Sequence, residues 1–292
     1  MNGKITSRMP TAEYHALPGV NITSLKEMKR SAKHYQYRLA NPRSADKLTL
    51  GIAAHVATLE PERFEGQFAI WTRRGETGKL CPRKGQYWDA FLHSNPGKTL
   101  ITEDDLEKAL AMARAVRSDP LAARYLETGE PEVSMQWTTT SESLLRKPVE
   151  IACRGRVDWL TRVDGEHHLI GLKTSTDCRP FIFGAQAARL GYHLQWAYYH
   201  DGYKALTGVT PVLKEIVVES APPYDVAVNH ITEDVLLQGR SEYEVLLRQL
   251  VDCQSRNEWL GVAGGLEQII SLPTWAFDAQ DDLADIGLVT ET

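Results

Sequence analysis

Apolar residues recur at helical spacing in three stretches of the first 120 residues. The first predicted helix begins near Ser24, which forms a capping-box pattern with Glu27. A second helix is expected over residues 48–60, ending before Pro61 because a residue that precedes proline disfavours helix. A third is expected over residues 103–117. The chain therefore opens with a helical region.

The middle of the chain changes to the alternation of β-strands. Residues 133–137 alternate, and residues 149–160 place Val157 and Trp159 on one face and Asp158 on the other. Asp164-Gly165 is a strong hairpin turn signal. The elements expected after this turn are a strand at 168–174, a helix at 181–206, strands at 212–219 and 225–231, and a helix at 233–253.

This order of elements predicts an α/β (α+β) fold with a mixed central β-sheet flanked by helices. No linker divides the body, so residues 1–277 are expected to form one domain, followed by an acidic, flexible tail at 278–292.

Composition narrows the class of protein but not its partner. The 292 residues are 42% hydrophobic and 24% charged, as in ordinary soluble globular proteins. No apolar run is long enough for a membrane span or a signal peptide, so a cytoplasmic location is expected. The four cysteines show no CxxC spacing, which argues against a zinc ribbon. The net charge of −5 hides a basic first fifty residues, so charge leaves the partner undecided.

The predicted hairpin brings candidate chemistry together. A two-residue turn at Asp164-Gly165 places Asp158 directly opposite position 171, and Lys173 lies two residues along on the same face. An acid facing a second acid, followed two residues later by lysine, is typical of metal-dependent phosphodiesterases.

Several segments resemble a known family. Residues 154–158 (RGRVD) and 171–174 (GLKT) look like the two core motifs of the PD-(D/E)xK nuclease superfamily, which has a restriction-endonuclease-like core. The closest resemblance is to the RecE-like (exonuclease VIII type) branch, which is related to RecB-type nucleases. It covers most of residues 13–276, and its further segments are residues 51–64, 195–199 (QWAYY), 221–226 and 272–275.

The resemblance implies roles for individual residues. His55 and Asp158 would be metal ligands, Leu172 would lend its backbone carbonyl, and Lys173 would be catalytic. The implied cofactor is Mg²⁺, for which Mn²⁺ could substitute. The remaining site candidates are Gln195 and Tyr199, which would buttress the site or touch DNA. Additional candidates are Glu132, Glu60 and Arg156.

Position 171 departs from the family pattern. The family has Asp or Glu there, whereas Gly171 offers no ligand, and neither Glu166 nor His167 is placed to replace it. The glycine is either natural or introduced. Activity is therefore expected to be weak, and Gly171→Asp is expected to raise it by at least about 10²-fold.

The favoured function is a Mg²⁺-dependent exonuclease that degrades one strand of linear double-stranded DNA in recombination of the phage type. Polarity (5′ to 3′), a ring-shaped homo-oligomer and a single-strand annealing partner protein are implied by the resemblance alone. The alternatives are a non-catalytic DNA-end binding protein and a structural protein with a nuclease fold. Basic residues that could contact DNA, or simply form a solvated helix face, are Lys26, Lys29, Arg30 and Lys33.

Without the family context, several of these residues have simpler interpretations. His55 could be a satisfied core histidine, Asp158 could pair with Arg156 on an exposed strand, and Lys173 could be a solvated lysine. The order of the motifs along the chain favours the functional interpretation over these alternatives.

Overall fold

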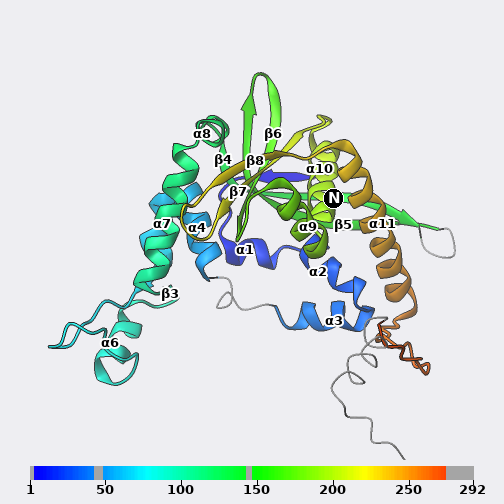
Figure 1. Ribbon diagram of the computed structural model, residues 1–292. Helices are drawn as coiled ribbons and strands as arrows, with labels where there is room; N and C mark the ends of the chain where they lie inside the picture. The colour runs from blue at the N-terminus through cyan, green and yellow to red at the C-terminus, as the bar shows by residue number, and fades with distance from the viewer. Residues whose placement is uncertain (1–2, 43–48, 143–146, 274–292) are drawn as a thin grey trace, which may run out of the picture.

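A six-stranded sheet forms the centre of the computed structural model, which describes residues 3–42, 49–142 and 147–273. Its strands lie in the order β1-β4-β5-β6-β7-β8 (Figure 1), and neighbours are antiparallel except for the parallel pair β6 and β7. Their bounds are Lys4–Thr6 (β1), Glu130–Glu142 (β4), Pro148–Val163 (β5), Glu166–Ser175 (β6), Val212–Glu219 (β7) and Val226–His230 (β8). A separate parallel pair joins β2 (Phe68–Ile70) to β3 (Thr99–Ile101). The predicted mixed sheet flanked by helices is confirmed.

Helices cover both faces of this sheet. One face carries α4 and α7, and the other carries α9, α10 and α11 (Figure 1). The α-helices are α1 (Thr11–Ala16), α2 (Ile22–Leu25), α3 (Ala32–Ala40), α4 (Thr49–Leu59), α5 (Phe64–Gln67), α6 (Gln86–Ser94), α7 (Glu103–Ser118), α8 (Pro120–Leu126), α9 (Pro180–Leu190), α10 (Tyr192–Thr207) and α11 (Glu233–Arg256), with 3₁₀ turns η1 (Lys26–Lys29) and η3 (Pro61–Arg63). Within the described ranges, no helix combines the length and apolarity needed to cross a membrane.

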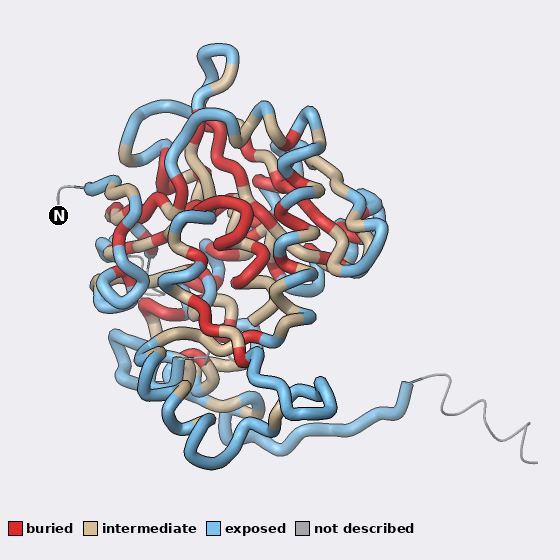
Figure 2. Tube along the Cα trace, turned by 90° about the vertical axis from the view of Figure 1, so that its left-hand side faces the viewer, coloured by how far each residue is buried: buried red, intermediate tan, exposed pale blue. Residues whose placement is uncertain are grey.

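Two apolar cores lie on opposite faces of the sheet, because strand side chains alternate between faces. On β6, Leu169 packs into the core beneath α10 and α11, whereas Ile170 and Leu172 pack into the core beneath α4 and α7. The buried residues gather in the interior of the molecule, and exposed segments surround them (Figure 2). The sheet is therefore held rigidly from both sides.

The β5–β6 hairpin has the predicted turn and register. Asp164 and Gly165 both have positive φ angles, 52° and 86°, as a two-residue type I′ turn requires. Paired residues run from Val163–Glu166 to Trp159–Ile170, which is the register expected from the sequence. The ladder stops there, so Asp158 and Gly171 are the first positions beyond it.

The regular pleat of β5 breaks at Asp158. Val157 packs into the core beneath α10, but Trp159 packs against the core beneath α4 and α7. The prediction that Val157 and Trp159 lie on the same face is therefore wrong. The neighbouring strand β4 breaks at the same level, where Glu132 has a φ of 52° that is unusual for a residue with a side chain.

Two predicted helices are each divided. The helix expected from Ser24 is instead α2, η1 and α3, because Asn21 caps α2 by accepting from Ser24 N–H and Ser31 caps α3 by accepting from His34 N–H. The helix expected over 181–206 is α9 and α10, separated by Gly191, whose φ is 66°.

The other expected elements are confirmed within a few residues, as α4, α7, β4 to β8 and α11. The expected tail at 278–292 and the last two residues of the motif at 272–275 lie outside the described residues.

Candidate active site

Asp158 lies where β5 and β6 stop pairing. Its Oδ2 accepts a hydrogen bond from the backbone N–H of Leu172 at 2.9 Å, in place of a ladder bond. The same oxygen lies 3.2 Å from Nζ of Lys173 and 3.2 Å from Nε2 of His55. Burial alone would raise the pKa of Asp158, but the positive charges of Lys173 and His55 outweigh it and lower that pKa. Asp158 is therefore an anion held among three donors.

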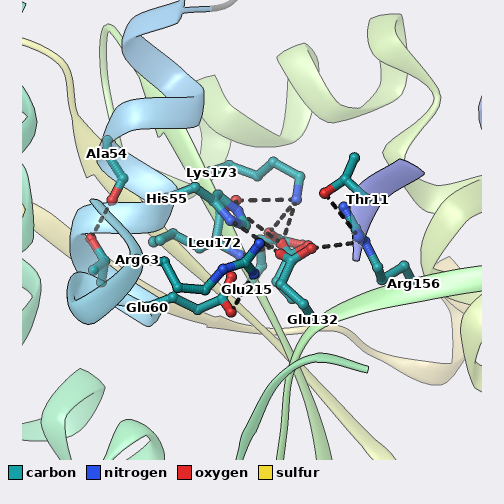
Figure 3. A network of polar contacts seen from close by, with 12 residues as sticks. Thr11, Ala54, His55, Glu60, Arg63, Glu132, Arg156, Leu172, Lys173 and Glu215 are labelled. Carbon is teal, nitrogen blue, oxygen red and sulfur yellow. Dashed lines mark hydrogen bonds and ion pairs between the residues drawn. The ribbon is translucent and has the colours of Figure 1, made fainter. Parts of the chain in front are cut away.

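Helix α4 presents His55 to this carboxylate. The apolar residues Ala53, Ala54 and Val56 fix the helix against the sheet, and His55 points toward β6 (Figure 3). Its Nε2 lies 3.0 Å from the carbonyl oxygen of Leu172. Burial lowers the pKa of His55, but the charge of Asp158 more than compensates and raises it. The three predicted ligand groups are thus together.

Glu132 joins them from β4. Its Oε1 lies 3.9 Å from Nδ1 of His55, and its Oε2 pairs with Nε of Arg156 at 2.7 Å (Figure 3). One ligand atom each from His55, Glu132 and Asp158 lies within 4.8 Å of the other two. Burial raises the pKa of Glu132 although Arg156 counteracts it. Glu132, an additional candidate from the sequence, therefore lies at the centre of the site. Its left-handed backbone is a strained conformation of the kind found at functional sites.

Lys173 is the cation among these acids. Its Nζ lies 3.2 Å from Asp158 Oδ2, 3.2 Å from the Leu172 carbonyl oxygen and 3.3 Å from Glu215 Oε1. Burial would lower the pKa of Lys173, but the charges of Asp158 and Glu215 raise it overall. Lys173 is thus protonated and positively charged in this arrangement.

Gln195 and Tyr199 from α10 reach the same place. They line one cavity with Asp158, Gly171 and Lys173, and Gln195 Nε2 donates to the Tyr199 hydroxyl oxygen at 3.2 Å. Burial raises the pKa of Tyr199, so its hydroxyl is neutral.

The other candidates are placed less centrally. Glu60 is buried, but its carboxylate is held by Arg63 at 2.6 Å and is not in the group formed by His55, Glu132 and Asp158. Among the four basic residues proposed for DNA contact, Lys29 pairs with Glu242, and Lys26 donates to the Leu190 carbonyl oxygen at 3.1 Å. Arg30 and Lys33 are exposed, and Arg30 lies 3.8 Å from Glu27.

Sequence reasoning missed Glu215. This residue is the parallel partner of Gly171 on β7, it is 1% exposed, and Trp196 Nε1 donates to its Oε2. Burial raises its pKa despite Lys173. A Cβ added at Gly171 would lie 2.7 Å from Cδ of Glu215, so a carboxylate does occupy the space beside position 171. The expectation that no acid reaches this position is corrected.

One signal in the sequence could have drawn attention to Glu215. It is an acid within the apolar run VLKEIVVE, which was correctly predicted as a strand. A carboxylate in the middle of a buried strand requires a partner.

The donor atoms suit a divalent cation. Carboxylates, a backbone carbonyl and one imidazole form an oxygen-rich set, which hard cations such as Mg²⁺ and Mn²⁺ prefer. PDDEXK nucleases generally use divalent metals, so these residues fit the cofactor that the fold implies.

Comparisons with known proteins bear on the fold and on the family of the chain. A solved structure from Eubacterium rectale, described as a "Putative exonuclease", has a TM-score of 0.57 and 14% sequence identity, covering 94% of this chain and 98% of that chain. A second, described as "SSO0001", has a TM-score of 0.34 and 11% identity, covering 81% of this chain and 82% of that chain. The first likeness shows a shared fold.

No curated protein matches the sequence. A family model does match residues 21–271, and it is described as a PDDEXK-like domain of unknown function. This match spans most of the chain and both core motifs, RGRVD and GLKT. The chain therefore belongs to the DUF3799 family of PDDEXK-like, nuclease-fold domains.

Proposed function

We propose that this protein is a divalent-metal-dependent DNA nuclease that acts on the ends of double-stranded DNA. The observation that carries the proposal is the convergence of His55, Glu132 and Asp158, whose ligand atoms lie within 4.8 Å of one another. Lys173 lies beside them, 3.2 Å from Asp158. A structural ion pair would need neither the strained backbone of Glu132 nor a histidine directed at a backbone carbonyl.

Each residue has a role that follows from its position. Asp158, His55, Glu132 and the Leu172 carbonyl would hold the cation, which supplies Lewis acidity toward phosphate and lowers the pKa of a bound water. Lys173 remains protonated, so it can neutralise charge on a phosphate oxygen. The Tyr199 hydroxyl remains neutral, so it can hydrogen-bond to a phosphate oxygen without repelling it.

Finer features of the proposal rest on the sequence resemblance. They are membership of the RecE-like branch, use of Mg²⁺ with Mn²⁺ as a substitute, 5′-to-3′ polarity, a role in recombination, a ring-shaped oligomer and a single-strand annealing partner. Duplexes labelled at one 5′ or one 3′ end test polarity, and light scattering after gel filtration tests the ring.

The test of nuclease activity compares linear with covalently closed duplex DNA. We expect release of acid-soluble nucleotides from linear DNA in Mg²⁺ or Mn²⁺, none in EDTA, and little from closed circles. Asp158→Asn should abolish the release because it removes the charge of the central ligand. Asp201→Asn is the matched control, because Asp201 is a half-buried carboxylate that belongs to a different hydrogen-bond network.

Two results would contradict the proposal. Binding of DNA ends without release of nucleotides at any metal concentration would favour a non-catalytic DNA-end binding protein. Equal release by wild type and Asp158→Asn would mean that the chemistry lies elsewhere.

A further inference from the structure

We propose that Glu215 supplies a further carboxylate to the metal site, beside those of Asp158 and Glu132, reaching across from β7 to the place where the family pattern has an acid on β6. Gly171 then leaves room for this carboxylate and is not a defect. The inference rests on the proposed function, since it assigns another residue to the same site.

The register of the sheet places the two residues side by side. Gly171 and Glu215 are Cα partners in the parallel β6–β7 ladder. The side chain of Glu215 extends over Gly171, because a Cβ added there would meet the Cδ of Glu215 at 2.7 Å, closer than real Cβ contacts. An acid at 171 and the observed Glu215 conformation exclude each other. A carboxylate therefore lies at this place and is carried by β7 instead of β6.

The burial of Glu215 indicates a function beyond packing. Its side chain is 1% exposed, and its Oε1 pairs with Nζ of Lys173 at 3.3 Å but makes no other hydrogen bond among the residues that the structure describes. Burying a carboxylate is costly unless it is fully paired and hydrogen-bonded, and an apolar residue at this position would avoid that cost. Glu215 lies outside the group of ligand atoms formed by His55, Glu132 and Asp158, but it lines one cavity with Asp158, Gly171 and Lys173 (Figure 3 shows Glu215 beside Lys173). This shared cavity is what connects its carboxylate to the site.

The positions of the charges agree with this role. Nζ of Lys173 lies 3.3 Å from Glu215 Oε1 and 3.2 Å from Asp158 Oδ2, so one positive charge bridges the two carboxylates. In the family pattern, the hairpin geometry places two carboxylates at positions 158 and 171, where they could share a metal ion. The second member of that pair comes from position 215.

The inference reverses the expected effect of restoring the family residue. Gly171→Asp should weaken metal binding, because the new side chain displaces the carboxylate of Glu215. The double variant Gly171→Asp/Glu215→Ala should recover binding, because it removes the clash and returns the acid to β6. Glu215→Gln keeps the shape of the side chain and removes its charge.

The experiment is calorimetric titration of Mn²⁺ into the metal-free protein without DNA. We expect Glu215→Gln and Gly171→Asp each to weaken Mn²⁺ affinity by at least about tenfold. We expect the double variant to return to within about threefold of wild type, since effects at touching residues are not additive. Glu219→Gln is the matched control, because Glu219 lies on the same strand four residues away and should leave affinity unchanged. Circular dichroism and thermal unfolding in EDTA establish that each variant is folded.

Separate results decide the two proposals. Wild-type affinity in Glu215→Gln would overturn the role of Glu215, even if its nuclease activity fell, because Glu215 would then act only by positioning Lys173. A double variant that binds Mn²⁺ no better than Gly171→Asp would overturn the inference that Glu215 on β7 takes the place of an acid at position 171 on β6. Absence of both Mn²⁺ binding and DNA cleavage in the wild type would instead overturn the proposed function.

Discussion

Two half-buried ionic networks in this protein use similar residues in opposite ways. Asp201 on α10 accepts hydrogen bonds from Arg240 at 2.7 Å through both Nε and Nη2, and from the Tyr243 hydroxyl at 2.6 Å. Asp158 on β5 is similarly buried, with 17% of its side chain exposed against 23% for Asp201. The Asp201 network joins two packed helices and satisfies its carboxylate with directed donors.

The network around Asp158 is not closed in this way. Asp158 and Glu215 share the single ammonium of Lys173, and Glu132 lies beside His55 in the same site. Within the described part of the chain, the Oε1 of Glu215 makes no hydrogen bond beyond its ion pair with Lys173. Glu132 also has a left-handed backbone. A network built for stability completes its hydrogen bonds, whereas one built to bind a cation leaves oxygens directed at a common point.

The largest expected difference between the networks is catalytic. Lys173→Met should lower the rate of nucleotide release by roughly 10²–10³-fold, as loss of about 3–4 kcal/mol of transition-state stabilisation implies. Arg240→Met should leave the rate unchanged at a temperature where the variant is folded. Initial rates of nucleotide release from linear duplex DNA measure both effects. Equal losses of rate in Lys173→Met and Arg240→Met would contradict the distinction between the two networks.

The second difference lies in coupling between metal and stability. Mn²⁺ at 100 times its dissociation constant should raise the free energy of unfolding by about 2.7 kcal/mol, because it binds the folded state only. Urea unfolding with and without Mn²⁺ should show this gain in wild type and in Asp201→Asn. The gain should be absent in Asp158→Asn; a full gain in that variant would place the metal elsewhere.

The third difference concerns intrinsic stability. Asp201→Asn should lower the free energy of unfolding by about 2 kcal/mol, because it weakens charge-assisted hydrogen bonds from Arg240 and Tyr243. Urea unfolding in EDTA measures this loss. A change of a few tenths of a kcal/mol would show that the α10–α11 network contributes little.

The smallest effect is a dependence on pH. Burial would raise the pKa of Asp201, but hydrogen bonds from His200, Arg240 and Tyr243 lower it overall. A carboxyl with a lowered folded-state pKa stabilises the protein above its unfolded-state pKa of about 4, and loses that contribution as pH falls toward the folded value.

The stability gap between wild type and Asp201→Asn should therefore shrink between about pH 6 and about pH 3, by a few tenths to about 1 kcal/mol. Urea midpoints at a series of pH values measure the gap. A gap that grows on acidification would contradict the assigned direction of the pKa shift.

Local patterns were sufficient where local physics decides. The Asp164-Gly165 turn fixed the hairpin and its register, because both residues tolerate the positive φ angles of a two-residue turn. Helix α7 was predicted within one residue of its end, and Thr102 and Asp105 cap its start. Gly191 could have indicated the division between α9 and α10, but glycine inside an apolar pattern is ambiguous until its φ is known.

The motifs alone also brought His55, Asp158, Leu172 and Lys173 to one place, and this grouping is what the structure has. Two features of the site, the phase change at Asp158 and the position of Glu215, could not be found in this way. The phase change at Asp158 depends on a matching break at Glu132 in the neighbouring strand, and alternation within one strand gives no sign of it.

The sequence by itself determined the mixed sheet, the hairpin and the order of the motifs, because these follow from periodicity, turn chemistry and spacing. Tertiary structure decided which carboxylate lies beside position 171. Glu215 reaches Gly171 only through a parallel pairing whose connection runs through α9 and α10, and no short-range rule sets the register of such a crossover. Packing of the intervening helices fixes that register, and with it the acid that faces Lys173.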